Sequence, residues 1–149
     1  MGGAAPGAGR GPGAGGVRFL IVALSRAALA AALFFAALPG TAAAADARKG
    51  EEIYGRCLAC HALGYDRTGP RHCGLFGRRA GSVAGFAYSD AMRRSRIVWS
   101  AKTLDRFIAD PLKTVPGTAM GYAGVKDARE RADLIAYLEA ANRSAACVK

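Results

Sequence analysis

The sequence predicts an all-α fold, with three to five short helices joined by long glycine-rich loops. Helix-capping residues precede the apolar runs in residues 89–142, and the apolar residues of the longer runs recur at helical spacing. No segment shows sustained alternation of apolar and polar residues, which is the pattern typical of strands. Long loops without secondary structure are uncommon in a compact domain, so we expect a bound group to supply part of the core.

Residues 48–57 are expected to form the first helix. Ser89 and Asp90 are expected to cap a short second helix that ends near Ser95. Between these helices, residues 62–81 hold glycine and proline at a density that indicates loops and turns.

Two longer helices are expected in the C-terminal part of the chain. Ser100 caps the first of them, which ends at Asp110–Pro111 because the residue before a proline avoids helical backbone angles. The second begins after Asp127, with Glu130 completing a capping box, and runs to about Asn142. The apolar residues on the inner faces of these two helices are Leu104, Phe107, Ile108, Leu134, Ile135, Leu138 and Ala141.

We interpret residues 1–45 as a secretory signal peptide. Arg18 and Arg26 precede a short apolar run at residues 27–38, and Ala43–Ala45 provides an A-x-A cleavage site. A basic region, a short apolar region and small residues at the cleavage site are the layout of such a leader.

The alternative is an uncleaved membrane anchor. Residues 19–38 are long enough to cross a bilayer, but Arg26 lies inside this segment, where a charge is costly. We expect residues 46–149 to form one domain in the periplasm, attached to the membrane only if the leader is retained.

The overall charge limits the kinds of partner. The chain has 149 residues and a formal net charge of +10, which favours an anionic partner. It contains no nucleic-acid motif, and few aromatic residues lie among the basic ones. We therefore expect no nucleic-acid binding.

Residues 57–61 read Cys-Leu-Ala-Cys-His, the C-x-x-C-H pattern of covalent c-type haem attachment. Cys57 and Cys60 can each form a thioether with a haem vinyl group, and His61 can then bind the iron. A thioredoxin-like pair would need a βαβ context, which the sequence lacks. A zinc site would need a second, suitably spaced pair, whereas His72 and Cys73 are adjacent. The motif and the export signal together predict one covalent haem c.

Met120 is the candidate for the second axial ligand. It follows the Pro116–Gly117 turn and does not lie on the apolar stripe of a helix, so a loop ligand is favoured over core filling. A thioether ligand raises the reduction potential of a haem iron.

With these motifs in order, the chain resembles class I cytochrome c, of the mitochondrial cytochrome c and bacterial cytochrome c2 type, over nearly all of residues 46–149. The matching segments are Cys57 to His61, Thr68 to Pro70, Gly74 to Arg78, Gly85 to Ala91, Trp99, Pro116 to Met120, and Arg131 to Leu138. The resemblance implies the class I cytochrome c fold around one covalent haem.

The resemblance also implies roles for individual side chains. His61 and Met120 would be the axial iron ligands, and the carbonyl of Pro70 would accept a hydrogen bond from His61 Nδ1. The first and last helices would cross closely at Gly50. The side chains implied to lie at a haem propionate are Arg78, Tyr88, Trp99 and Thr118.

Two departures from the family pattern concern the haem pocket. Phe107 occupies a position where the family usually has Tyr, and Met92 one where Asn is frequent. Both remove polar groups, so we expect a drier pocket and an altered reduction potential, which Phe107→Tyr would test. The basic rim is also thinner than in mitochondrial members, which predicts weaker salt dependence of association. The cations that fit the rim are Arg56, Arg67, Lys113 and Lys126.

The segment Arg71-His72-Cys73 departs most from the family, which usually has Asn-Leu before the third position. Cys73 and Cys147 are the two cysteines outside the haem motif, and in an oxidising compartment such a pair tends to be joined. The family fold places this loop near the end of the last helix, so we expect a Cys73–Cys147 disulfide. Two free thiols are the alternative. His72 could compete for the iron, but we expect a hydrogen-bonded loop histidine.

The resemblance implies a monomeric single-electron carrier that cycles between Fe(II) and Fe(III) and is not an enzyme. Its partners would be acidic surfaces of redox proteins, such as a quinol-oxidising complex and a terminal oxidase. One alternative is a dedicated electron-transfer subunit of a periplasmic dehydrogenase. A haem peroxidase or gas-binding protein is disfavoured by Met120 and by the lack of an evident distal His–Arg pair in the sequence.

Overall fold

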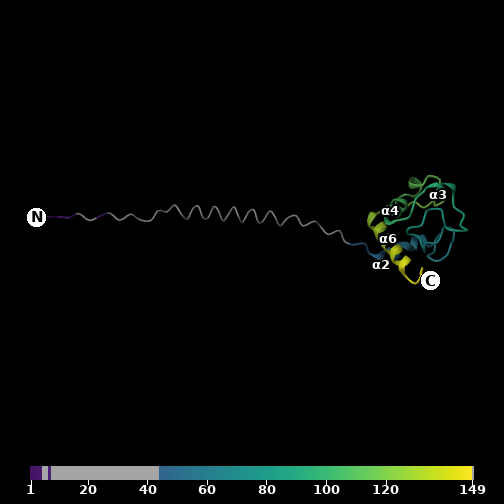
Figure 1. Cartoon of the computed structure of the whole chain (residues 1–149), viewed down its shortest axis with the longest axis horizontal. Coiled ribbons are helices and arrows are strands. Elements are labelled where there is room, and N and C mark those ends of the chain that lie inside the picture. Colours follow the sequence, from purple (N-terminus) through teal and green to yellow (C-terminus); the bar gives the residue numbers. More distant parts are fainter. Residues whose placement is uncertain (5–6, 8–43, 149) are drawn as a thin grey trace. The chain divides into compact units, whose positions relative to one another are not determined.

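The protein is described by a computed structural model over residues 1–4, 7 and 44–148. The part from residue 44 onward forms a helical domain (Figure 1). Most of the expected leader, including its apolar run, lies outside the described residues. In the parts that are described, no helix is long and apolar enough to cross a membrane.

The all-α prediction is confirmed for residues 44–148. This segment contains five α-helices and one short 3-10 helix, and no strand beyond an isolated bridge between Arg79 and Val98. In chain order the elements are α2 (Ala47–Tyr54), η1 (Gly55–Cys57), α3 (Asp90–Arg94), α4 (Ala101–Ala109), α5 (Pro111–Thr114) and α6 (Ala128–Arg143).

The three predicted caps begin three of the helices. Ser89, Ser100 and Asp127 precede α3, α4 and α6, and each side chain accepts a hydrogen bond from the backbone N–H three residues later, at 3.2, 3.2 and 2.8 Å. Such bonds satisfy N–H groups that have no partner within a helix. The first helix, predicted over residues 48–57, is α-helical only to Tyr54 and then tightens into η1.

One detail of the helix predictions was wrong, and one short helix was not predicted. The Glu130 side chain does not complete a capping box but forms a bidentate pair with Arg56, at 2.6 and 2.8 Å. Asp110–Pro111 ends α4 but also starts α5, because Asp110 accepts a hydrogen bond from Lys113 N at 3.1 Å and proline is well suited to the first helical position.

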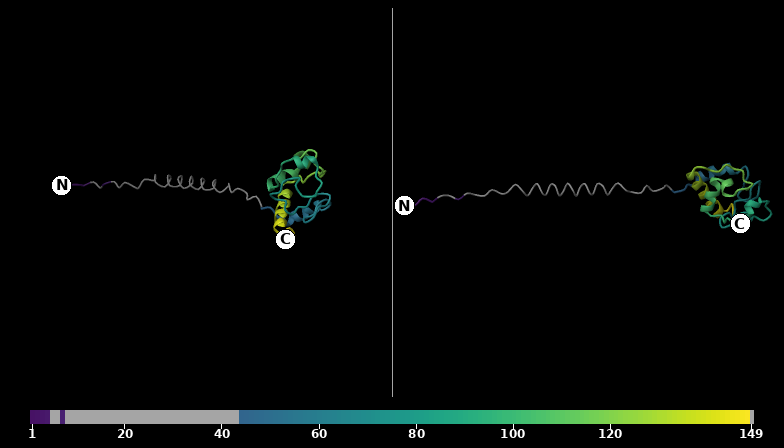
Figure 2. Two further views of the ribbon diagram at one scale, coloured as in Figure 1. Left: turned by 45° about the vertical axis from the view of Figure 1, so that its right-hand side comes forward. Right: turned by 90° about the horizontal axis from the view of Figure 1, so that it is seen from above.

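The core forms where the apolar faces of α2, α4 and α6 meet. All seven apolar residues predicted on the inner faces of α4 and α6 are buried. Figure 2 shows the domain in two further views. The C-terminal tail lies against the long loop that follows residues 57–61, because Cys147 of the tail is joined to Cys73 of the loop. In this loop, residues 62–88 contain no helix, so the space that it encloses with the helices defines the site.

Candidate functional site

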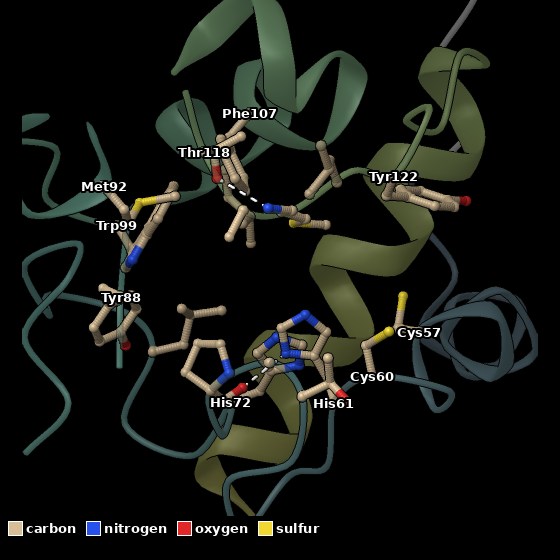
Figure 3. Close-up of a pocket in the computed structure, with 18 of the residues that line it drawn as sticks. Cys57, Cys60, His61, His72, Tyr88, Met92, Trp99, Phe107, Thr118 and Tyr122 are labelled. Carbon is tan, nitrogen blue, oxygen red and sulfur yellow. Dashed lines mark hydrogen bonds between the residues drawn. The ribbon is translucent and has the colours of Figure 1, made fainter. Parts of the chain in front are cut away.

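The helices and loops line a cavity of about 490 Å³ (Figure 3). This volume lies in the range of small-molecule and cofactor sites. Its apolar lining includes Leu75, Met92, Leu104, Phe107, Ile108, Leu134 and Leu138. Both residues that depart from the family pattern, Met92 and Phe107, are therefore in the wall, and Trp99 packs on Phe107 with ring centroids 5.1 Å apart.

Cys57, Cys60 and His61 lie on one turn of chain at the edge of the cavity. Cys60 N and His61 N both donate to the carbonyl of Cys57, at 3.1 and 2.9 Å. Neither cysteine is in a disulfide, and Figure 3 shows their sulfur atoms next to each other, beside His61. Burial raises the pKa of the Cys57 thiol, and the neighbouring Arg56 partly opposes this effect. The two thiols are thus placed to react with one group in the cavity.

His61 is a neutral imidazole, and one of its two ring nitrogens is hydrogen-bonded to the backbone. Nδ1 lies 2.8 Å from the carbonyl oxygen of Pro70, which can only accept, so Nδ1 carries the proton. Burial lowers the pKa of His61, and the Pro70 hydrogen bond partly offsets this. A Cβ atom on Gly69 would lie 2.2 Å from His61 Cε1, so only glycine fits beside this ring. Nε2 remains as the nitrogen that could bind a metal.

Met120 belongs to the opposite wall. Gly117 adopts φ +87°, a left-handed conformation that glycine favours, and this turn leads into Thr118. Met120 N donates to Thr118 Oγ1 at 3.2 Å, which is the dashed line at Thr118 in Figure 3. The figure places Thr118 across the cavity from His61. His61 and Met120 both line the cavity, and the Thr118 hydroxyl oxygen anchors the methionine loop on the wall across from His61.

Arg78 brings a positive charge to the cavity and forms no ion pair within residues 44–148. It donates to the carbonyls of Cys73 and Arg71, at 3.0 and 2.9 Å, and burial lowers its pKa. Figure 3 shows the polar ends of Tyr88 and Trp99 together at one edge of the cavity. A half-buried guanidinium, together with the indole N–H of Trp99 and the hydroxyl of Tyr88, suits a carboxylate on the bound group.

These features fit a haem. The cavity has a mainly apolar lining, two thiols at one side and donors for carboxylates at another, and its lining includes the imidazole of His61 and the methionine Met120. Imidazole and thioether are an established axial pair for haem iron.

The sequence did not predict that His72 is part of the cavity wall. Its ring stacks on that of His61, with centroids 4.3 Å apart and planes 20° apart, and its Nδ1 lies 3.1 Å from the hydroxyl of Tyr54. The expected hydrogen-bonded loop histidine is present, but inside the site. The only signal in the sequence was a histidine at a position where the family usually has leucine.

Cys73 and Cys147 are joined in the structure, with Cα atoms 5.1 Å apart. This bond attaches the C-terminal tail to the loop that carries His72 and Arg78.

Comparisons with known proteins give a consistent match. Residues 47–142 match the family model for cytochrome c. The chain is 46% identical over 110 residues to cytochrome c2 of Blastochloris viridis, covering 72% of this chain and 87% of that protein. It is 41% identical over 97 residues to cytochrome c of Euglena viridis, covering 63% and 95%. Among solved structures, cytochrome cH from Methylobacterium extorquens matches with a TM-score of 0.62 and 40% identity, covering 64% of this chain and 98% of that one.

Proposed function

This chain belongs to the cytochrome c family, whose members are electron carriers with covalently bound haem c and not enzymes, and from this premise we propose that it is a periplasmic single-electron shuttle between respiratory complexes. When bound, the haem iron takes up and releases one electron. The proposed donor is a quinol-oxidising complex and the proposed acceptor a terminal oxidase.

The proposed haem ligands are the residues of the two facing walls. Cys57 and Cys60 would form the thioethers to the haem, and His61 Nε2 and Met120 Sδ would bind its iron. The observation that carries this assignment is the facing placement of His61 and the Thr118-anchored Met120. If His61 and Met120 both bind the iron, no position would remain for an external ligand, which suits an electron carrier.

Arg78, Tyr88 and Trp99 are proposed to hold a haem propionate, with Thr118 near it. The absence of any ion pair to Arg78 among the described residues supports this, because a half-buried cation is stabilised by an anionic partner. In this arrangement the protein would neutralise the propionate, and the apolar lining would keep water from the centre of the site.

The basic surface is proposed to dock on acidic patches of the partners. Arg56 lines the cavity and is paired with Glu130, and Lys126 lies 3.8 Å from Asp110. These pairs neutralise two of the four cations expected at the rim, which supports weaker salt dependence of docking than in a relative with free lysines there.

Residues 1–45 are proposed to be a cleaved leader. Asp46, the first residue after the proposed cleavage site, caps α2 through its side chain at 2.9 Å from Arg48 N. Its backbone N donates to Asp133 at 2.7 Å. Asp46 is thus held by the fold through its side chain and its backbone N, so it belongs to the domain that would remain after cleavage.

The test is the optical spectrum of residues 46–149 produced with a c-type haem maturation system. We expect sharp low-spin bands when the protein is reduced and the weak red charge-transfer band of a methionine-ligated ferric haem when it is oxidised. Met120→Ala should abolish that band, whereas the matched control Met92→Leu should retain it. A high-spin wild-type spectrum with ready binding of cyanide or CO would contradict the carrier proposal and favour a peroxidase or gas-binding protein.

A further inference from the structure

His72 forms one face of the pocket around His61. The two imidazole rings are nearly parallel, with a centroid distance of 4.3 Å and an angle of 20°, and Figure 3 shows both on the same side of the cavity. The backbone of His72 is itself fixed, because its N–H donates to the carbonyl of Ala62, next to His61, at 3.0 Å.

The side chain of His72 is held by Tyr54. The phenol oxygen lies 3.1 Å from His72 Nδ1, and Tyr54, on α2, is only 3% exposed. Burial raises the pKa of Tyr54, so its hydroxyl keeps its proton and can donate to Nδ1. This hydrogen bond lies in the wall of a mainly apolar cavity.

This arrangement completes the restraint on His61. The hydrogen bond to Pro70 fixes the position of Nδ1, but a single bond leaves the ring free to rock about that point. The stacked ring of His72 removes this freedom, because the His61 plane cannot tilt toward His72 without a clash. Since Tyr54 in turn packs on Tyr137 of α6, with ring centroids 5.1 Å apart, the plane of His61 is tied to the helix pair α2–α6.

An apolar residue at position 72 would fill the same space without any polar group to satisfy. A buried hydrogen-bonded pair adds little net stability over a well-packed apolar pair, but it adds orientation, because a hydrogen bond is directional and dispersion contacts are not. The His72–Tyr54 pair is thus better suited to holding a ring in one plane than to stabilising the core.

We propose that His72 is a positioning residue for His61, and that Tyr54 holds His72 in place so that the plane of the iron-binding imidazole is set by the protein. This inference rests on the proposed role of His61 as an iron ligand. Groups that orient metal-bound histidines also tune the metal. Disturbing this pair will therefore alter both the geometry of the His61–iron bond and the reduction potential.

The test uses variants of holo residues 46–149 that break the hydrogen bond and keep both rings. Tyr54→Phe removes the hydroxyl of this hydrogen bond, and His72→Phe removes its ring nitrogen. Tyr137→Phe is the matched control, because it removes a hydroxyl from the ring that packs on Tyr54 without touching His72. The readouts are the g values of the ferric electron paramagnetic resonance spectrum, the paramagnetically shifted proton resonances of the haem methyls and the His61 ring, and the reduction potential.

We expect Tyr54→Phe and His72→Phe to shift the g values, the haem methyl pattern and the potential, and Tyr137→Phe to match wild type. The double variant should shift no further than His72→Phe alone, because both changes break one interaction. If the two variants lower only the melting temperature and leave these readouts at wild-type values, His72 is a packing residue and the inference is wrong. If wild type itself lacks a His/Met low-spin spectrum, the ligand assignment is wrong, and the positioning role is overturned with it.

Discussion

Gly50 and Asp133 mark the point where the backbones of α2 and α6 touch. A Cβ atom built on Gly50 would lie 1.9 Å from the carbonyl oxygen of Asp133 and 2.8 Å from the Cβ atom of Tyr137. No real Cβ atom tolerates such distances, so the helices can cross this closely only with glycine at position 50. The close crossing that the family resemblance implied is confirmed, and Tyr54 follows it one turn later on α2.

Gly50→Ala will force α2 and α6 apart. Overpacking of this kind typically lowers the free energy of unfolding by about 1–3 kcal/mol, and the obstacle here is backbone that cannot rotate away. Gly55→Ala is the matched control, because a Cβ atom there meets nothing within 4 Å and the residue has φ −49°. It should be neutral or stabilising by about 0.4–1 kcal/mol. Urea denaturation of the two holoproteins will show the difference, and equal stability of both variants would contradict this account of the crossing.

Arg78→Gln will lower the reduction potential. The oxidised haem carries one more positive charge than the reduced haem, so a nearby guanidinium disfavours oxidation, and its removal makes oxidation easier. We expect an effect of about 1.4 kcal/mol, or roughly 59 mV for a one-electron couple. Arg79→Gln serves as the control, since Arg79 is exposed and bonded to the carbonyl of Arg93 at 3.4 Å. Spectroelectrochemical titration at neutral pH measures both, and equal shifts in the two variants would contradict a specific role for Arg78.

The Cys73–Cys147 disulfide will stabilise the mature domain. It closes a long segment, with a sequence separation of 74, and disulfides that restrict the unfolded chain typically contribute about 2–4 kcal/mol. The double variant Cys73→Ser/Cys147→Ser should lose this amount in chemical denaturation. Independently, unfolded holoprotein should react with a maleimide only after reduction, because Cys57 and Cys60 are consumed by the haem. Labelling of two thiols without reductant would show that the pair is free.

Most of the fold could be predicted from local signals in the sequence. Ser89, Ser100 and Asp127 act on N–H groups within the next turn, so their effect is visible in the sequence itself. Glu130 could not be assigned in this way, because its partner Arg56 is 74 positions away. α5 was missed because Pro111 was interpreted only as the end of a helix, although proline also favours a helix start.

The site residues that lie in short contiguous motifs could be predicted from the sequence. A contact that depends on how a long loop folds back could not. The Cys-x-x-Cys-His motif and the Pro-Gly turn before Met120 are contiguous, so spacing alone indicates their role. The contact between His61 and His72 depends on how a glycine-rich loop returns to the cavity. Glycine permits many such paths, and local sequence does not select among them. His72 could therefore be recognised as unusual without its position being known.

The Arg56–Glu130 pair will make stability depend on pH in the acid range. The two hydrogen bonds from Arg56 hold the pKa of Glu130 below its usual value. A carboxylate whose pKa is lower in the folded state stabilises the fold above its unfolded pKa, about 4.3, and loses that contribution as the pH falls through the folded-state pKa. Glu130→Gln should therefore melt below wild type at neutral pH, and the gap should shrink as the pH falls below about 4.3.

Glu139→Gln is the control for this titration, because Glu139 lies on the same helix α6 and forms no ion pair among the described residues. Its melting temperature should follow that of wild type at every pH. Added salt should also reduce the gap for Glu130→Gln at neutral pH, since both partners of the Arg56 pair are exposed, with side-chain accessibilities of 48% and 37%. A gap that grows on acidification would mean that Glu130 is destabilising when ionised, which is the opposite of what a bidentate pair with Arg56 requires.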